Sequence, residues 1–113
     1  MTAASQAKLW YLQRISAMVL AVCVLIHLVT IIVAVRGGLS AAEILARTQG
    51  SAIAAVFYGT FVVAAAIHAP IGLAKICEEW LQWRGRSLAA IMILLATALL
   101  LLGSVAIWGL VHV

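Results

Sequence analysis

Three long apolar segments dominate the chain, at residues 16–35, 52–74 and 88–111. Each is long enough to cross about 30 Å of hydrocarbon, a distance that takes about 20 helical residues. Only a helix satisfies all of its backbone polar groups within one segment in lipid. We therefore predict an all-α integral membrane protein, a bundle of three transmembrane helices at about 12–35, 52–76 and 87–111.

The composition excludes a soluble globular domain. Hydrophobic residues make up 67% of the 113 residues and charged residues only 9%, whereas a soluble domain carries about a quarter charged residues. The first apolar segment is longer than the core of a signal peptide, and no small-residue cleavage site follows it. We expect it to remain as a mature helix, so that residues 1–113 form a single transmembrane anchor domain.

The connecting segments are short and carry their own signals. After the first span, Gly37 and Gly38 break the helix, and Ser40 with Glu43 forms a capping box. This pattern predicts a short interfacial helix at about 40–48. The segment 75–86 is predicted to be a loop that contains Glu78 and Glu79. Its two tryptophans alternate with charges, which is typical either of an interfacial aromatic belt or of a docking surface for a cytoplasmic partner.

Basic residues are distributed unequally between the two sides of the predicted membrane. Five of them, at positions 8, 14, 75, 84 and 86, lie on one side, against Arg36 and Arg47 on the other. The positive-inside rule then predicts a cytoplasmic N-terminus and a C-terminus outside. Topology alone explains the net charge of +4, so we expect contacts with lipid and no nucleic acid. No convincing transit peptide precedes the first span, which favours a prokaryotic cytoplasmic (inner) membrane.

Two histidines lie within predicted spans, His27 in the first and His68 in the second. An imidazole in hydrocarbon must find a polar partner. That partner can be a hydrogen-bonding group of a neighbouring helix, or the iron of a b-type haem, for which neutral imidazole is a standard axial ligand. His112 is expected to be an exposed terminal residue, and the cysteines, Cys23 and Cys77, to be small apolar fillers.

Small residues surround His68. Gly72 and Ala64 each lie one helical turn away, and Pro70 removes one backbone hydrogen bond from the helix. A flat macrocycle needs such space, but small residues mark tight helix packing equally well.

Several short motifs together resemble a known family. From His68 the sequence reads His-Ala-Pro-Ile-Gly, Glu79 and Trp80 follow eleven and twelve positions after the histidine, and a third apolar helix comes next. This order is similar to the small membrane-anchor subunits of succinate dehydrogenase and fumarate reductase, the succinate:quinone oxidoreductases. Segment 13–17, Gln-Arg-Ile-Ser-Ala, resembles the basic-x-hydroxyl signature that opens the first helix of the partner anchor.

The resemblance implies roles for particular residues. His68 would ligate haem iron with Gly72 beside the macrocycle, and Arg14 would lie near a quinone or a haem propionate. The implied quinone-binding set is Arg14, Ser16, Glu79 and Trp80. Glu79 stands where an aspartate is usual and Trp80 where a tyrosine is common. An indole N–H does not readily exchange its proton, which puts the role of Trp80 in doubt.

The function implied is electron relay between an iron-sulfur subunit and membrane quinone. The chain would have no catalytic residues of its own and would act with a flavoprotein, an iron-sulfur subunit and a second membrane anchor. In this respiratory complex, succinate oxidation or fumarate reduction takes place in the flavoprotein, outside this chain.

Depth suggests that the two histidines serve different haems. His27 lies thirteen residues after Arg14, or about 20 Å deep, whereas His68 lies seven residues before Lys75, or about 10 Å deep. Two axial ligands of one iron must lie at almost the same height. Diheme members of the family stack their haems across the membrane, so the resemblance implies two b haems shared with the partner anchor. The alternative is that His27 is a hydrogen-bonded packing residue in a single-haem complex.

Two other functions remain as alternatives. A small proton-coupled transporter would carry an acidic residue within a helix and usually has four spans, and neither is predicted here. A cofactor-free assembly scaffold would have no need for intramembrane histidines at these positions.

Overall fold

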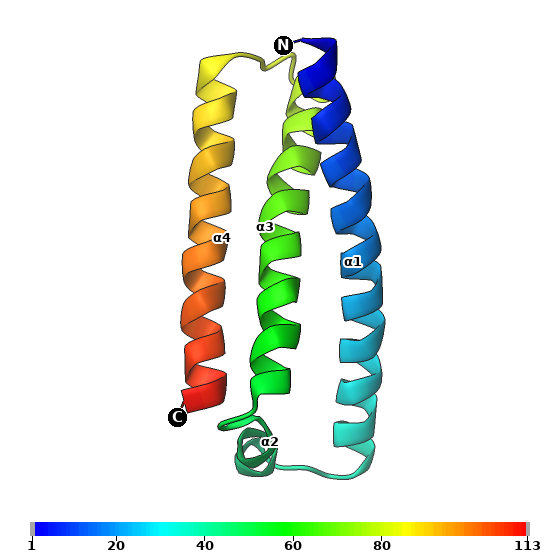
Figure 1. Ribbon diagram of the computed structural model, residues 1–113, viewed down its shortest axis with the longest axis vertical. Coiled ribbons are helices and arrows are strands. Elements are labelled where there is room, and N and C mark those ends of the chain that lie inside the picture. Colours follow the sequence, from blue (N-terminus) through cyan, green and yellow to red (C-terminus); the bar gives the residue numbers. More distant parts are fainter. Residues whose placement is uncertain (1, 113) are drawn as a thin grey trace.

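The computed structural model describes residues 2–112, and within them the chain forms four helices (Figure 1). These are α1 (Ala3–Arg36), α2 (Ala41–Thr48), α3 (Ala52–Trp80) and α4 (Arg86–His112). The three long helices are all long and apolar enough to cross a membrane. The prediction of an all-α bundle with three transmembrane helices is therefore confirmed.

Helix α1 begins well before the predicted start at about residue 12. Thr2 caps it, because its side-chain oxygen accepts a hydrogen bond from the backbone N–H of Ser5 at 3.1 Å. The apolar segment marked only the part that lies in lipid, whereas residues 3–11 contain no glycine or proline that would stop a helix. With 34 residues, α1 is about 51 Å long and exceeds the hydrocarbon thickness.

Helix α3 extends past its predicted end at about residue 76. It continues to Trp80, so Glu78 and Glu79 lie on its last turns, and their predicted placement in a loop was wrong. Charged residues such as these are good helix formers. The helix ends at Trp80, and two residues later the backbone of Gln82 adopts a positive φ of 56°, which is incompatible with a right-handed helix.

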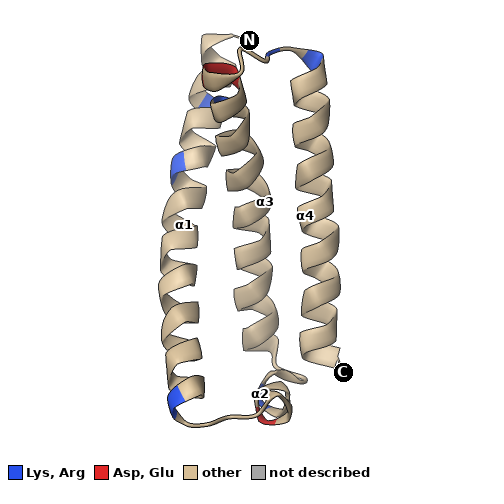
Figure 2. Ribbon diagram, turned by 180° about the vertical axis from the view of Figure 1, so that it is seen from behind, with Lys and Arg blue, Asp and Glu red and all other residues tan. Residues whose placement is uncertain are grey.

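Helix α3 lies between α1 and α4 and packs against both (Figure 1). The start of α1 and the α3–α4 loop lie at one end of the bundle, which we call the N-terminal end. Helix α2 and the end of α4 lie at the other, the α2 end. Lysine, arginine and glutamate residues lie toward these two ends, and the middle of the bundle contains none (Figure 2). This separation matches the predicted spans.

Helix α2 ties the α2 end together. The predicted capping box is present, since the Ser40 hydroxyl accepts a hydrogen bond from the backbone N–H of Glu43 at 3.2 Å. The Thr48 hydroxyl donates to the Leu110 carbonyl at 2.8 Å, and the Gly50 N–H donates to the Val111 carbonyl at 2.8 Å. These bonds satisfy carbonyls in the last turn of α4 that the helix itself leaves free.

The buried core is small and built mainly from compact side chains. Both cysteines belong to it and neither forms a disulfide, as their expected use as small apolar fillers requires. Most of the large apolar side chains face outward, as expected of helices surrounded by lipid. The buried apolar residues are Cys23, Ala64, Ala66, Cys77, Leu88, Met92 and Val111.

The close approach of α3 and α4 depends on Gly103. A Cβ atom added there would overlap the Val62 side chain, whose branched Cβ has little freedom to move. We expect Gly103→Ala to lower the free energy of unfolding of the detergent-solubilised protein by about 1–3 kcal/mol. Gly109→Ala is the matched control, because no atom lies within 4 Å of a Cβ at Gly109. Equal stability of the two variants would show that this contact does not hold the helices together.

Candidate functional site

His27 faces α3 and is held there by a tyrosine. Its Nδ1 lies 3.2 Å from the hydroxyl oxygen of Tyr58, and the two rings meet edge to face, with centroids 5.6 Å apart and planes at 87°. The other ring nitrogen, Nε2, makes no hydrogen bond within residues 2–112. The imidazole is therefore fixed at one nitrogen and free at the other.

Further aromatic rings enclose this imidazole. The Phe61 ring lies edge to face with His27, with centroids 6.1 Å apart, and Phe57 contacts both Tyr58 and Phe61. The sequence interpretation missed Tyr58. A signal was available, because a tyrosine in an apolar helix needs a partner for its hydroxyl and His27 lies in the adjacent antiparallel helix.

His68 lies partly buried on α3, one turn after the buried Ala64. Its Nδ1 is buried and has no hydrogen-bond partner in the part of the chain that the structure describes. Leaving such a nitrogen unsatisfied in an apolar environment costs several kcal/mol. A group from outside this chain would remove that cost.

The two histidines lie at different depths in the bundle. His27 contacts Tyr58 and Phe61, which precede His68 on α3 by ten and seven residues. At 1.5 Å per residue, the two imidazoles are separated by about 10–15 Å along the helix axis. A single iron cannot take both of them as axial ligands across such a difference in height.

Gly72 lies against α1. A Cβ atom at this position would stand 3.0 Å from Nε2 of Gln13, so the missing side chain makes room for this amide one turn from His68. The Oε1 atom of Gln13 is itself buried without a partner among the described residues. Gln13 was not identified as a site residue from the sequence. Nothing there distinguished it from its neighbours in the segment that opens the first helix.

Arg14 and Ser16 follow Gln13 on α1 and point in different directions. The Arg14 guanidinium is exposed and lies 5.0 Å from the centroid of the Trp10 ring, within the range of a cation–π interaction. The Ser16 hydroxyl is buried and donates to the Gln13 carbonyl at 3.1 Å. The hydroxyl oxygen keeps its capacity to accept a hydrogen bond.

Glu79 and Trp80 are exposed on the last turn of α3, and the Trp80 side chain is 80% exposed. Lys75 pairs with the neighbouring Glu78 at 3.6 Å. Glu79 has no cationic partner in residues 2–112, so its carboxylate is available to other groups.

A groove at the N-terminal end lies close to these residues but contains none of them. It has a volume of about 650 Å³, an apolar floor and a charged rim that includes the paired Glu78. Arg14, Ser16, Glu79 and Trp80 are therefore not gathered into one pocket by this chain alone. The groove is lined by Gln6, Leu9, Pro70, Ile71, Ala74, Lys75, Glu78, Arg84, Gly85, Arg86, Leu88, Ala89, Met92 and Ile93.

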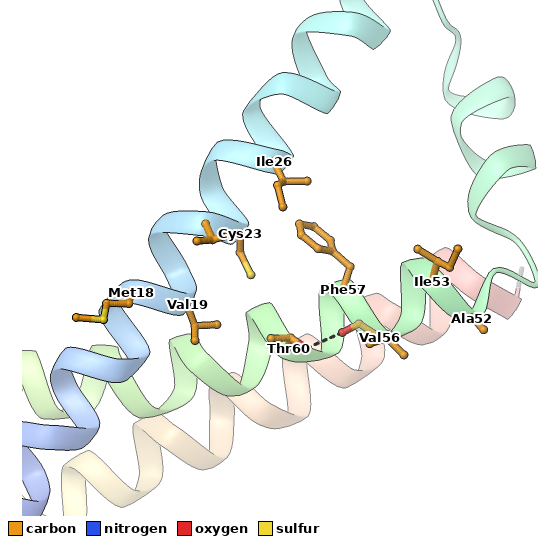
Figure 3. Close-up of a pocket in the computed structure, with 10 residues that line it drawn as sticks. Met18, Val19, Cys23, Ile26, Ala52, Ile53, Val56, Phe57 and Thr60 are labelled. Carbon is orange, nitrogen blue, oxygen red and sulfur yellow. Dashed lines mark hydrogen bonds between the residues drawn. The ribbon is translucent and has the colours of Figure 1, made fainter.

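A second groove, of about 790 Å³, lies between α1 and α3 (Figure 3). Its lining is apolar apart from the sulfur atoms of Met18 and Cys23 and the hydroxyl of Thr60, which donates to the Val56 carbonyl of its own helix at 2.8 Å. The groove contains no charged side chain that could hold a headgroup. The candidate site therefore consists of the two histidines and the residues of the N-terminal end.

These residues fit a b-type haem better than a bare metal ion. No cluster of three or more metal-ligating side chains occurs within residues 2–112. A haem iron needs only one axial ligand from each side. Within the described residues, Nε2 of His27 makes no hydrogen bond, and neither ring nitrogen of His68 makes one.

A comparison with known protein families covers the residues of the candidate site. The model of the succinate dehydrogenase/fumarate reductase transmembrane subunit family matches residues 1–104, which include both intramembrane histidines and the whole N-terminal end. No curated protein and no solved structure matches the chain significantly. Because the family match covers nearly the whole chain, this protein belongs to the family of succinate dehydrogenase/fumarate reductase transmembrane subunits.

Proposed function

We propose that the chain is the anchor subunit that binds b haem and quinone in a succinate:quinone oxidoreductase. It relays electrons between an iron-sulfur subunit and membrane quinone, beside a second anchor subunit and a flavoprotein. The complex lies in a prokaryotic cytoplasmic membrane with the N-terminal end of this chain toward the cytoplasm. The observation that carries this proposal is the pair of intramembrane imidazoles with unpaired nitrogens within the described chain: Nε2 in His27, and both ring nitrogens in His68.

His68 and His27 would each offer a neutral imidazole to one haem, and the partner anchor would supply the opposite ligands. A bound b haem supplies a one-electron carrier inside the membrane. Gly72 allows Gln13 to approach α3 one turn from His68, which keeps α1 and α3 close beside the haem. The exposed Arg14 guanidinium can make charge-assisted hydrogen bonds to a propionate.

The quinone would bind at the N-terminal end. Arg14 can donate to a quinone carbonyl, Ser16 can accept from a quinol hydroxyl, and Glu79 can deliver or remove protons. Trp80 can donate one hydrogen bond through its indole N–H. Because Glu79 and Trp80 are exposed in the isolated chain, the iron-sulfur subunit or the partner anchor would close the site over them.

Purification from native membranes tests the proposed function. We expect the chain to copurify with a flavoprotein and an iron-sulfur protein, and the reduced complex to show b-type absorption bands. Copurification without these bands would remove the haem from the proposal. The haem bands without flavin would contradict the proposed partners.

Replacing Glu79 tests the quinone site. We expect Glu79→Gln to lower the rate of quinone reduction by about 100-fold, the usual order for loss of a general acid or base. Electron transfer to a soluble dye should remain, because dye reduction needs no proton at this end of the membrane subunit. Arg14→Gln should show the same selectivity. Glu78→Gln is the neighbouring control, since Lys75 already pairs with that carboxylate. Equal losses in both assays would contradict the assignment.

A further inference from the structure

The hydroxyl of Tyr58 is the one hydrogen-bond partner that the His27 imidazole has within residues 2–112. We propose that Tyr58 is a positioning residue that accepts a hydrogen bond from the Nδ1–H of His27 and leaves Nε2 as the nitrogen that binds haem iron. This inference depends on the proposed function, because it assigns the ligating atom and its support within one of the two haem sites.

In the proposed arrangement the Tyr58 oxygen is the acceptor, and this role sets the tautomer of His27. A neutral imidazole has one N–H donor and one acceptor nitrogen. With the Tyr58 oxygen 3.2 Å from Nδ1 and acting as acceptor, the proton lies on Nδ1 and the lone pair on Nε2. Histidines that bind metals usually donate their second N–H in this way, and such a bond raises the basicity of the ligating nitrogen.

The aromatic neighbours fix the direction of the ring. Tyr58 and Phe61 are three residues apart, so they share one face of α3. Both rings stand nearly perpendicular to the imidazole, at 87° and 86°, and restrict its rotation. The two rings thus restrict the orientation of the imidazole, which a ligand needs before the metal arrives.

The unpaired Nε2 indicates that a group from outside the chain bonds to it. In hydrocarbon an unpaired ring nitrogen is costly, and no residue within 2–112 bonds to it. His68 differs, because its Nδ1 has no such support from this chain. The two sites are therefore inequivalent, and a change at Tyr58 should be felt at one haem only.

The opposite proton arrangement predicts a different role. If Tyr58 donated its proton to Nδ1, Nε2 would carry the second proton and could not bind iron. His27 would then be a packing residue that donates a hydrogen bond to the partner anchor. Redox titration of the haems distinguishes the two arrangements.

The test replaces Tyr58 by phenylalanine in the intact complex. Loss of the acceptor reduces electron donation from the imidazole, so we expect the midpoint potential of one haem to rise. A tenfold change in its ferric-to-ferrous equilibrium corresponds to about 59 mV for one electron. That haem should also be retained about tenfold less well. The other haem should keep its potential.

Two further variants test whether the effect comes from the hydrogen-bond acceptor at position 58. Tyr58→Gln restores an acceptor oxygen and should return the potential close to that of the unmodified complex. If Tyr58→Phe fails to assemble, full haem content with unchanged potentials in Tyr58→Gln supports the proposal, and loss of haem overturns it. Tyr11→Phe is the control, because this tyrosine is exposed on α1 and its hydroxyl makes no hydrogen bond within the described residues.

Three outcomes would overturn the inference. These are unchanged potentials in Tyr58→Phe, equal shifts of both haems, and a glutamine variant that behaves like the phenylalanine variant. A complex that contains no b haem at all would instead refute the proposed function. The experiment therefore distinguishes a wrong role for Tyr58 from a wrong function for the complex.

Discussion

Replacing His68 by alanine is expected to remove one b haem from the complex. In the proposed complex each haem iron takes one axial ligand from this chain, so the ratio of haem to flavin should fall from about two to about one. The buried Nδ1 of this histidine has no partner within residues 2–112, so its loss leaves no polar group of the described chain newly unsatisfied. The complex should therefore assemble, and flavin-linked oxidation of succinate with a soluble dye should persist.

Replacing His68 by methionine tests more directly whether this position ligates haem iron. Because methionine can ligate haem iron and raises its potential relative to histidine, His68→Met should retain the haem at a higher midpoint potential. His112→Ala is the matched control, since this third histidine is exposed at the end of α4 and only stacks on Trp108, with ring centroids 3.9 Å apart. Full haem content in His68→Ala would exclude His68 as a ligand.

Much of the fold was predictable because membrane helices obey a simple constraint. Hydrocarbon requires about 20 apolar residues for each crossing, so the three spans and the short capped helix after Ser40 could be recognised directly. The ends of these helices could not be recognised from hydrophobicity. Residues 3–11 and 77–80 are helical but polar enough to lie outside the apolar segments, and hydrophobicity carries no information on where such a helix stops.

The candidate site was predictable one residue at a time but not as an arrangement. The two histidines stood out because imidazole is rare and costly in lipid. Their neighbours depend on how α1 meets α3, and a single sequence does not state that register. The contact between His27 and Tyr58 and the approach of Gln13 to Gly72 both arise from it.

The residues at the N-terminal end were likewise predictable singly but not as an arrangement. Arg14, Ser16, Glu79 and Trp80 come from the two helices that meet there, yet their side chains do not converge within this chain. Under the proposed function, we expect the partner subunits to bring these four side chains together. The groove at this end of the bundle contains Glu78 instead, a residue that no motif marked.

Replacing His27 by alanine is expected to remove the second b haem and leave the first. His27 lies level with Tyr58 and Phe61, about 10–15 Å along the helix axis from His68. Helix tilt absorbs only part of such a difference, so the two imidazoles cannot ligate one iron. The ratio of haem to flavin in His27→Ala should therefore fall from about two to about one, and the double variant with His68→Ala should bind no haem through this chain. Pyridine haemochrome absorbance scored against flavin content in the purified complex measures both ratios. A ratio near one in the unmodified complex that stays unchanged in His27→Ala would show that His27 is a packing residue bonded to Tyr58, with His68 as the single ligand from this subunit.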